Sequence, residues 1–373
     1  MRYGEAGQSH LLPFLGAAAL FAALTIMAHS VVLGLAAVIA GPVPAAQTAL
    51  SLSRKAVSGA AQEEAASMAE AAPESTGTAA SQPEAAAPIG GIESYLVELL
   101  GDDARPEGAG AVIEKNYPQG SGEKYVACGA GSIKNNTRQT AADIAAEIQD
   151  PLPFGVEKDS PDPQILIMHT HASEAFTPAG RDLYPASDTC RTEDTNYNIV
   201  HVGDVLADTL TAAGLQVLHD RTIYDYPSYT GSYIRSGAAV QAYLSQYPSL
   251  RIVIDLHRDA LCSDSVVYKT VAELPDAACS QVMLLVGTNA SGLYHPYWEE
   301  NLRLAVYLQD AVNAAHPTLM RPITLVNERY NQHLTRGSLI IEVGSSGNTL
   351  QEATRAVRLF GESAGPALAR LVQ

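Results

Sequence analysis

Histidine and acidic side chains stand directly after, or inside, three apolar runs that have the length of β-strands. Imidazole nitrogens and carboxylate oxygens are ligands of zinc, and a catalytic zinc keeps one coordination position for water. A further carboxylate could then accept a proton from that water as a general base. The candidates at the three runs are His169, His171, Glu174, His257 and Glu342.

Glu342 suits the role of general base by its position within the apolar run 339–343. A buried carboxylate without a partner is costly, so a purely structural role would need a cation such as Arg336. A single histidine at a strand end could be a hydrogen-bonded structural residue. Together, the three polar segments predict a hydrolytic metal site.

Apolar runs and helical spacings alternate along the second half of the chain and predict an α/β fold. Strands that alternate with helices favour a mostly parallel twisted sheet with helices on both faces. The carboxyl ends of parallel strands meet at one edge of the sheet, so the three polar segments should converge there. The predicted strands are 164–168, 215–218, 251–256, 281–286, 323–326 and 339–343.

The N-terminal residues have the composition of a membrane segment. The stretch 11–40 carries no formal charge, and about 20 apolar residues suffice to cross the hydrocarbon of a bilayer. A cleaved signal peptide is the alternative, but its apolar core would be only about 7–15 residues long. We therefore expect a short cytoplasmic N-terminus, residues 1–10, and a transmembrane signal anchor, residues 11–41.

Two further segments separate this anchor from the α/β region. Residues 42–91 are rich in Ala, Ser, Pro and Glu and contain no aromatic side chain, which predicts a disordered linker. Residues 92–160 combine short helical patterns with a Gly-rich stretch, and they form an accessory region of undefined role. The catalytic domain is expected over residues 161–373.

The charge balance argues against nucleic acid as a ligand. The 373 residues include 40 acidic and 23 basic side chains, which gives a formal net charge of −17. Nucleic-acid binding depends instead on the neutralisation of phosphates by basic side chains. The expected partners are therefore not nucleic acids.

Four cysteines lie beyond the expected anchor, and an even number is compatible with disulfides. Cys262 and Cys279 flank an apparent insertion and could form a local bridge. Free thiols are the alternative for all four. Zinc ligation by these cysteines is not expected, because none has C-x-x-C spacing.

The motifs of the C-terminal half are similar to those of the stage II sporulation protein P family. From about residue 164 to the C-terminus, the motifs are ILIMHTHASEAF, NIVHVGDVLADTL, HDRTIYDYPSYTGSYIRS, VIDLHRDA, ENLRLAVYL, RYNQHL and SLIIEVGSSGNTLQEA. The resemblance implies a peptidoglycan hydrolase related to zinc-dependent N-acetylmuramoyl-L-alanine amidases. It implies cleavage of the bond between muramic acid and the first L-Ala of the stem peptide, with cross-linked stems as a further expected substrate.

Residue roles follow from the same resemblance. His257, in DLHRDA, matches a zinc ligand of the amidases, and Glu342, in IIEVGSSGNTL, matches their catalytic glutamate. Zn²⁺ is therefore the expected cofactor. The candidates for binding the substrate or a developing oxyanion are Arg258, Asn331 and Gln332.

The remaining zinc ligands have alternatives. The family motif contains both His169 and His171, and alignment of the strand favours His171. The acidic ligand is Glu174 of the HTHASE run, which we favour, or Asp194 in its place. The metal shell is thus the part of the resemblance in which this sequence departs most from the amidases.

A tyrosine-rich loop precedes and enters the second predicted helix. Its rings could line a groove for sugar and peptide. Alternatively, two of the four tyrosines could be packing residues whose rings are partly buried and whose hydroxyls reach the surface. The tyrosines are Tyr224, Tyr226, Tyr229 and Tyr233.

The resemblance also implies a cellular role and partners. The role is septal wall thinning and forespore engulfment during sporulation. The expected partners are peptidoglycan, the membrane, and stage II sporulation proteins D and M. The expected location is the cell membrane, crossed once, with the catalytic domain outside the cytoplasm and facing the wall or septal space.

Two other interpretations compete with an amidase. An H-x-H motif after a strand also suggests an amidohydrolase-type metal enzyme, but the roughly 200 residues after His169 hardly hold an eight-fold barrel. The second is a non-catalytic cell-wall-binding scaffold with an amidase-like fold. It predicts that the protein releases nothing from peptidoglycan when zinc is supplied.

Overall fold

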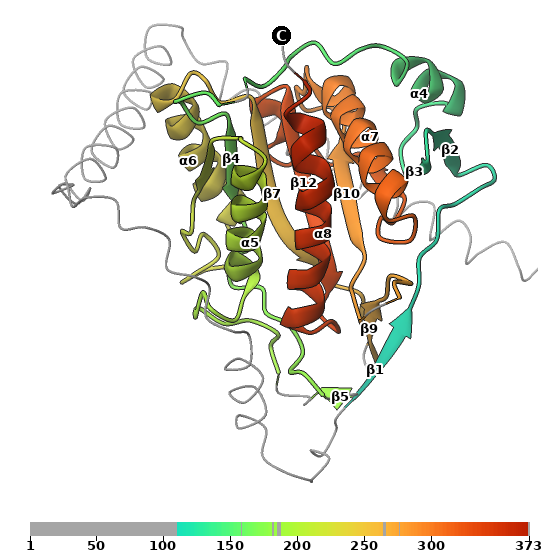
Figure 1. Ribbon diagram of the computed structural model, residues 1–373, viewed down its shortest axis with the longest axis vertical. Helices are drawn as coiled ribbons and strands as arrows, with labels where there is room; N and C mark the ends of the chain where they lie inside the picture. The colour runs from blue at the N-terminus through green and yellow to red at the C-terminus, as the bar shows by residue number, and fades with distance from the viewer. Residues whose placement is uncertain are drawn as a thin grey trace, which may run out of the picture. The chain divides into compact units, whose positions relative to one another are not determined.

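A computed structural model of the chain is drawn in Figure 1. It describes residues 110–157, 159–180, 183–184, 188–263, 266–275 and 277–371. The predicted signal anchor 11–41 and linker 42–91 lie outside these residues. Within the described ranges, no helix is both long and apolar enough to cross a membrane.

An eight-stranded sheet forms the centre of the fold, in the order β2-β3-β11-β10-β12-β7-β4-β6. Its strands are β2 Tyr125–Cys128, β3 Gly131–Asn135, β4 Ile165–Met168, β6 Val217–His219, β7 Ile252–Asp259, β10 Val282–Gly287, β11 Ile323–Val326 and β12 Gly337–Ser345. Strands β6, β4, β7 and β12 are parallel to one another. Strand β10 is antiparallel to β12, and β11 and β3 are parallel to β10.

The sheet is therefore mixed, but five of its seven strand pairings are parallel, so the prediction of a mostly parallel sheet is confirmed, with the pairings of β10 with β12 and of β2 with β3 as the exceptions. Neighbouring parallel strands need a long crossover connection, usually a helix. Only the short 3-10 segment Gln332–Leu334 lies between β11 and β12, so the chain reverses direction there. The described residues between β7 and β10 likewise contain strands and no helix.

Residues of the predicted accessory region share this sheet with the predicted catalytic domain. Strand β3 pairs with β11, with Ile133 beside Ile323. A second sheet has the order β5-β1-β9-β8, in which β1 Gly110–Lys115 pairs with β9 Val266–Thr270. Its other strands are β5 Leu183–Tyr184 and β8 Cys262–Ser263, and a short helix, α4 Ala141–Glu147, follows β3. Both sheets thus join the two regions.

Three helices cover one face of the central sheet. Helices α5 (Ile199–Ala212), α8 (Leu350–Leu368) and α7 (Trp298–Ala315) lie side by side over it (Figure 1). The approach of α8 to α5 requires Gly361, because a Cβ atom there would lie 1.9 Å from Oγ1 of Thr209. Apolar side chains of the three helices and the sheet form the main core.

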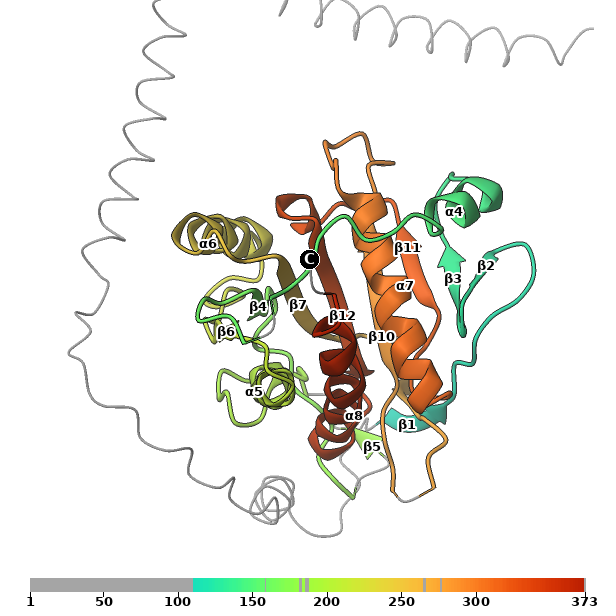
Figure 2. The ribbon, with the colours of Figure 1, turned by 45° about the horizontal axis from the view of Figure 1, so that its top comes forward.

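A fourth helix, α6 (Ser232–Gln246), covers part of the opposite face. Val240 of this helix packs with Leu166 and Val253 in a separate apolar cluster. Figure 2 shows α6 apart from α5, α8 and α7, beyond β4 and β7. The expectation of helices on both faces is confirmed, although the coverage is unequal.

The alternation of side chains along the strands decides which face each polar group meets. In β7, Ile254 and Leu256 belong to the main core, so His257 points to the opposite face. In β12, Val343 belongs to that core, so the neighbouring Glu342 points away from it. The register of β12 and β7 pairs Glu342 with His257. The backbone thus places a glutamate beside a histidine on the face of α6.

All four cysteines are free thiols. The expected bridge between Cys262 and Cys279 is therefore not formed, and the alternative of free thiols holds. Cys279 is buried and Cys262 is exposed. Burial raises the pKa of Cys279 to about 12, which keeps this thiol protonated.

Candidate active site

His171, Glu174 and His257 lie together beyond the carboxyl end of β4 and near that of β7. Glu174 Oε2 lies 3.5 Å from Nδ1 of His257. The rings of His171 and His257 meet edge to face, with 5.4 Å between their centroids. All three side chains are buried. The fold thus brings three of the predicted metal ligands into one group.

A carboxylate stands behind each histidine of this group. Asp255 Oδ1 lies 2.8 Å from Nε2 of His257, and Asp225 Oδ2 lies 4.0 Å from Nδ1 of His171. Because Asp255 holds Nε2 of His257, the Nδ1 atom of this ring faces Glu174. Carboxylates in this position orient the histidine ligands of metal sites.

The buried charges of the group shift one another's pKa values. Burial lowers the pKa of His257, but the charges and hydrogen bonds of Asp255 and Glu174 outweigh it and raise this pKa well above 6.5. Burial raises the pKa of Glu174, and the contact with His257 outweighs that effect and lowers it. Without a cation between them, the two carboxylates therefore favour the protonated form of His257, and a metal ion at Nδ1 would replace that proton.

Glu342 is the carboxyl group on the strand next to His257. Its Oε2 atom is buried and has no hydrogen-bond partner in the described part of the protein. Burial raises the pKa of Glu342 to about 8, although the charge of His257 acts to lower it. A carboxyl group that titrates near neutral pH can both accept and return a proton. This environment suits a general base.

The donor set fits zinc in its chemistry. Two imidazoles and a carboxylate make a common catalytic zinc shell, and bonds of about 2.0–2.1 Å at tetrahedral angles separate two ligand atoms by about 3.3 Å. The 3.5 Å between Glu174 Oε2 and His257 Nδ1 is close to that spacing. Across the ranges that the structure describes, however, no three His, Cys, Asp or Glu side chains have the geometry of a complete metal site.

Two of the alternative ligands lie apart from this group. His169 follows Ile167 by two residues, so both side chains lie on the same face of the sheet. The side chain of His169 points toward α5 and is fully buried. Its Nδ1 donates to the carbonyl of Leu256 at 2.9 Å, and its Nε2 lies 2.8 Å from Nε2 of His219. Asp194 is exposed in a turn before α5. The structure therefore favours His171 over His169 and Glu174 over Asp194.

The predicted substrate-binding side chains make hydrogen bonds within the protein. The buried guanidinium of Arg258 donates to the carbonyl of Cys190 at 2.8 Å. The amide of Gln332 bonds to the backbone of β10, including the N–H of Gly287. The amide of Asn331 donates to α6. These bonds position the loops around the site, and contact of the three side chains with a substrate stays a prediction.

Two of the four loop tyrosines border the site. Tyr229 stacks on His171 at 4.4 Å between ring centroids, and Tyr233 meets the same ring edge to face at 5.5 Å. Burial raises the pKa of Tyr233 far above 10, so its hydroxyl remains a hydrogen-bond donor. Tyr226 is exposed, and Tyr224 is partly buried with its hydroxyl on a neighbouring carboxylate.

Sequence reasoning missed Asp255, Asp225 and Tyr330. The sequence did contain a signal for Asp255. It lies two residues before His257 in an apolar strand, so the two side chains must lie on the same face of the sheet. Asp225 lies in the loop after β6, and no local pattern marks it. Tyr330 has a φ of 51°, in the left-handed region, and its ring lies 5.5 Å from that of Tyr233.

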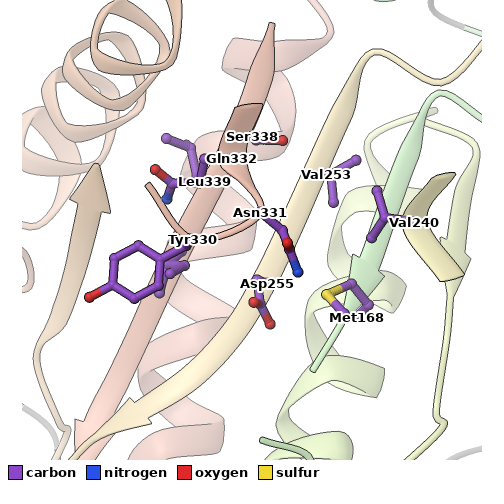
Figure 3. Close-up of a pocket in the computed structure, with 10 residues that line it drawn as sticks. Met168, Val240, Val253, Asp255, Tyr330, Asn331, Gln332, Ser338 and Leu339 are labelled. Atoms are coloured by element: carbon purple, nitrogen blue, oxygen red, sulfur yellow. The ribbon is translucent and has the colours of Figure 1, made fainter. Parts of the chain in front are cut away.

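A small cavity lies behind the site, next to Asp255 (Figure 3). Its volume is about 10 Å³, which is roughly the space of one water molecule. Figure 3 shows the lining side chains coming from β4, α6, β7, β12 and the segment before β12. The cavity adjoins the carboxylate that orients His257.

Solved structures of N-acetylmuramoyl-L-alanine amidases are similar to this chain. AmiC2 of Nostoc punctiforme is 12% identical with a TM-score of 0.31, and the match covers 56% of this chain and 96% of that chain. Ami1 of Mycobacterium smegmatis is 12% identical with a TM-score of 0.32, and the match covers 56% and 97%. At these TM-scores the likenesses identify neither a reaction nor a substrate for this chain.

Comparison with curated sequences gives a more specific relationship. Stage II sporulation protein P of Bacillus subtilis (strain 168) is 26% identical over 203 residues, which cover 52% of this chain and 48% of that protein. The match thus spans about half the length of the curated relative. The sequence profile of the family described as Stage II sporulation protein P (SpoIIP) matches residues 107–363. Because that match covers well over half of its 373 residues, the chain belongs to the stage II sporulation protein P family.

Proposed function

We propose that this chain is a peptidoglycan hydrolase of sporulating cells. In this proposal it cleaves the amide bond between N-acetylmuramic acid and the first L-alanine of the stem peptide. Membership of the family supports the role in sporulation. The observation that supports a hydrolytic site is the grouping of His171, Glu174 and His257 beside Glu342 on one face of the sheet.

Zinc bound by His171, Glu174 and His257 would polarise the scissile carbonyl and lower the pKa of a water molecule. Glu342 accepts the proton of the attacking water and later returns it to the leaving amine. Its buried Oε2 has no competing hydrogen bond from the described residues, so it is free to take that proton. Its raised pKa makes the return of the proton favourable.

The surrounding residues hold this arrangement in place. Asp255 fixes the ring of His257, and Asp225 lies behind His171. Tyr229 covers the face of His171 and reduces the access of water to it. The ring of Tyr233 meets the same histidine edge to face, and its protonated hydroxyl is the proposed donor to an oxyanion or a sugar.

The proposal includes anchoring in the cell membrane. The uncharged stretch 11–40 supports a single-pass anchor, and the linker 42–91 would let the catalytic part reach the wall outside the cytoplasm. Septal thinning and engulfment of the forespore are the proposed role. Stage II sporulation proteins D and M are proposed partners on the basis of the family alone.

Identification of the products tests the cleaved bond. Purified chain and zinc are incubated with intact sacculi, and the newly exposed amino groups are labelled and identified after acid hydrolysis. Cleavage of the proposed bond gives L-alanine amino ends, whereas hydrolysis of cross-links exposes amino groups of the diamino acid. Glu342→Gln is the matched control, because it keeps the size of the side chain and removes the base.

A non-catalytic wall-binding scaffold is the second candidate. It is favoured by the observation that no complete three-ligand metal geometry exists among the described residues. This candidate predicts that the protein sediments with sacculi and releases no soluble fragment at any zinc concentration. Release that disappears in Glu342→Gln would exclude it.

A further inference from the structure

Arg191 lies in a segment that pairs with the motif of the proposed metal ligands. An isolated antiparallel bridge joins Arg191 to Glu174, and the N–H of Thr192 donates to the carbonyl of Ser173 at 2.8 Å. These backbone contacts fix the point from which the side chain of Arg191 extends. Its side chain is 33% exposed, so it lies at the border between the buried group and the solvent.

The guanidinium of Arg191 pairs with two carboxylates of the candidate active site. Its Nη1 donates to Oδ2 of Asp225 at 2.7 Å, and its Nη2 lies 3.8 Å from Oε1 of Glu174. Among the described residues, no other lysine or arginine forms an ion pair with either carboxylate. Because the guanidinium is a rigid planar fork, it can hold two acceptors at a fixed separation.

The two carboxylates concern two different ligands of the proposed zinc site. Oε1 of Glu174 faces Arg191, and its other oxygen, Oε2, lies 3.5 Å from Nδ1 of His257. Asp225 lies 4.0 Å from Nδ1 of His171, which leaves Nε2 of that ring to bind zinc in the proposed site. Arg191 therefore contacts one ligand directly and another through the carboxylate behind it.

Asp225 depends on Arg191 for its counter-charge. The side chain of Asp225 is fully buried, and a buried carboxylate without a cation is costly. The hydroxyl and the N–H of Ser173 also donate to Asp225, at 2.6 and 3.2 Å, but they carry no charge. Without the guanidinium, Asp225 would lose its ion pair, and the ring of His171 would lose a fixed carboxylate behind it.

The same guanidinium lies over the ring of Tyr229. Its central carbon is 4.9 Å from the centroid of that ring, and Tyr229 also stacks on His171. Tyr229 is 57% exposed, so these two contacts hold a ring that is otherwise largely open to water. Arg191 thus also contributes to the position of the aromatic side chain that covers His171.

We propose that Arg191 is a positioning residue that holds Glu174 and His171 at the spacing required by zinc. This inference rests on the proposed function, because it assumes that these side chains bind the metal. Arg191 itself is not a ligand and acts through Glu174 and Asp225. Loss of its guanidinium therefore weakens zinc binding directly and slows hydrolysis as a consequence.

Competition with a chelating dye, on the purified full chain in detergent, measures the effect on zinc. Arg191→Met removes the charge and the donors, and it should weaken zinc binding about 10- to 100-fold. Arg191→Lys keeps the charge and removes the fork, and it should weaken binding at least about fivefold. Arg221→Met is the matched control, because Arg221 is 43% exposed and pairs with Asp204 outside the group. It should bind zinc within about twofold of the unmodified chain.

Two further readouts separate positioning from a role in folding alone. The visible absorption of bound Co²⁺ depends on the geometry of its ligands, so at saturating cobalt it should change in Arg191→Met and stay the same in Arg221→Met. If Arg191 acts through Asp225, the losses of zinc affinity in Arg191→Met and Asp225→Asn should also be non-additive. The double variant should then bind zinc more tightly than the product of the two losses predicts.

The fluorescence of Trp298 during urea unfolding shows which variants are folded. If Arg191→Met does not fold, Arg191→Lys, which retains the counter-charge of Asp225, decides the question. Zinc affinity within about threefold of that of the unmodified chain in the folded variants would overturn the proposal.

The measurements also distinguish this proposal from the proposed function. Weaker zinc binding by the Arg191 variants of a chain that releases no muropeptides would support the positioning role and refute the hydrolysis. Unchanged zinc affinity of the variants of an active chain would overturn the positioning role alone. Absence of zinc binding by the unmodified chain would overturn both.

Discussion

Replacing Glu342 with glutamine removes a buried ionisable group and keeps its size. Burial raises the pKa of Glu342 from 4.5 to about 8 in the folded protein. Since the folded state binds this proton more tightly than the unfolded state, the stabilisation from it is complete below about pH 4.5. It is then lost as the pH rises through about 8. Glutamine does not titrate, so the stability of the variant should not fall with pH in this way.

The size of the effect follows from the shift in pKa. A difference of about 3.5 units at about 1.4 kcal/mol per unit gives at most about 5 kcal/mol in the free energy of unfolding. Between about pH 5 and 8, each pH unit should therefore widen the stability difference between Glu342→Gln and the unmodified chain by up to about 1.4 kcal/mol. Above about pH 8 the difference should level off.

Urea unfolding at pH 5, 6, 7, 8 and 9 measures this difference. The purified chain is studied in detergent with EDTA, because a bound cation would itself lower the pKa of Glu342. The fluorescence of the single Trp298 reports unfolding. Glu362→Gln, at an exposed position on α8, is the control for loss of a carboxylate in general. A difference that does not change with pH, or a variant less stable than the unmodified chain at pH 9, would refute the reasoning.

Three further predictions concern the site and the packing around it. Asp255→Asn should weaken zinc binding, measured by competition with a chelating dye, about 10- to 100-fold, because this carboxylate orients His257. Tyr233→Phe should lower kcat on sacculi about 10- to 100-fold with little change in KM, since it removes a donor that acts on developing charge; an unchanged kcat would exclude this role. Gly361→Ala should destabilise the protein by about 1–3 kcal/mol in urea unfolding, because the new methyl group meets Thr209, and Thr209→Ala should restore only part of the loss, because the Cβ of residue 209 would still lie 2.8 Å from that methyl group.

Strand positions and the meeting of polar segments could be predicted because they depend on local pattern. The runs 251–256 and 339–343 correspond to β7 Ile252–Asp259 and β12 Gly337–Ser345. The rule that carboxyl ends of parallel strands share an edge then brought His257 and Glu342 together, and the register pairs these two residues.

Other features depend on contacts that no local pattern encodes. The reversal of β10 and β11 follows from connections without helices, which look like ordinary loops in the sequence. The pairing of β3 with β11 joins residues about 190 positions apart. His169 was the alternative to His171, and its side chain points to the face covered by α5, away from the metal ligands. Asp225 reaches His171 only because the loop after β6 folds back over the site.

The rate at which zinc-loaded protein releases soluble muropeptides from sacculi tests the central claim most directly. The account predicts that Glu342→Gln, shown to be folded by its unfolding curve, releases them about 10²- to 10⁴-fold more slowly than the unmodified chain, as expected for loss of a general base. A rate for Glu342→Gln within threefold of that of the unmodified chain would contradict the assignment of this site.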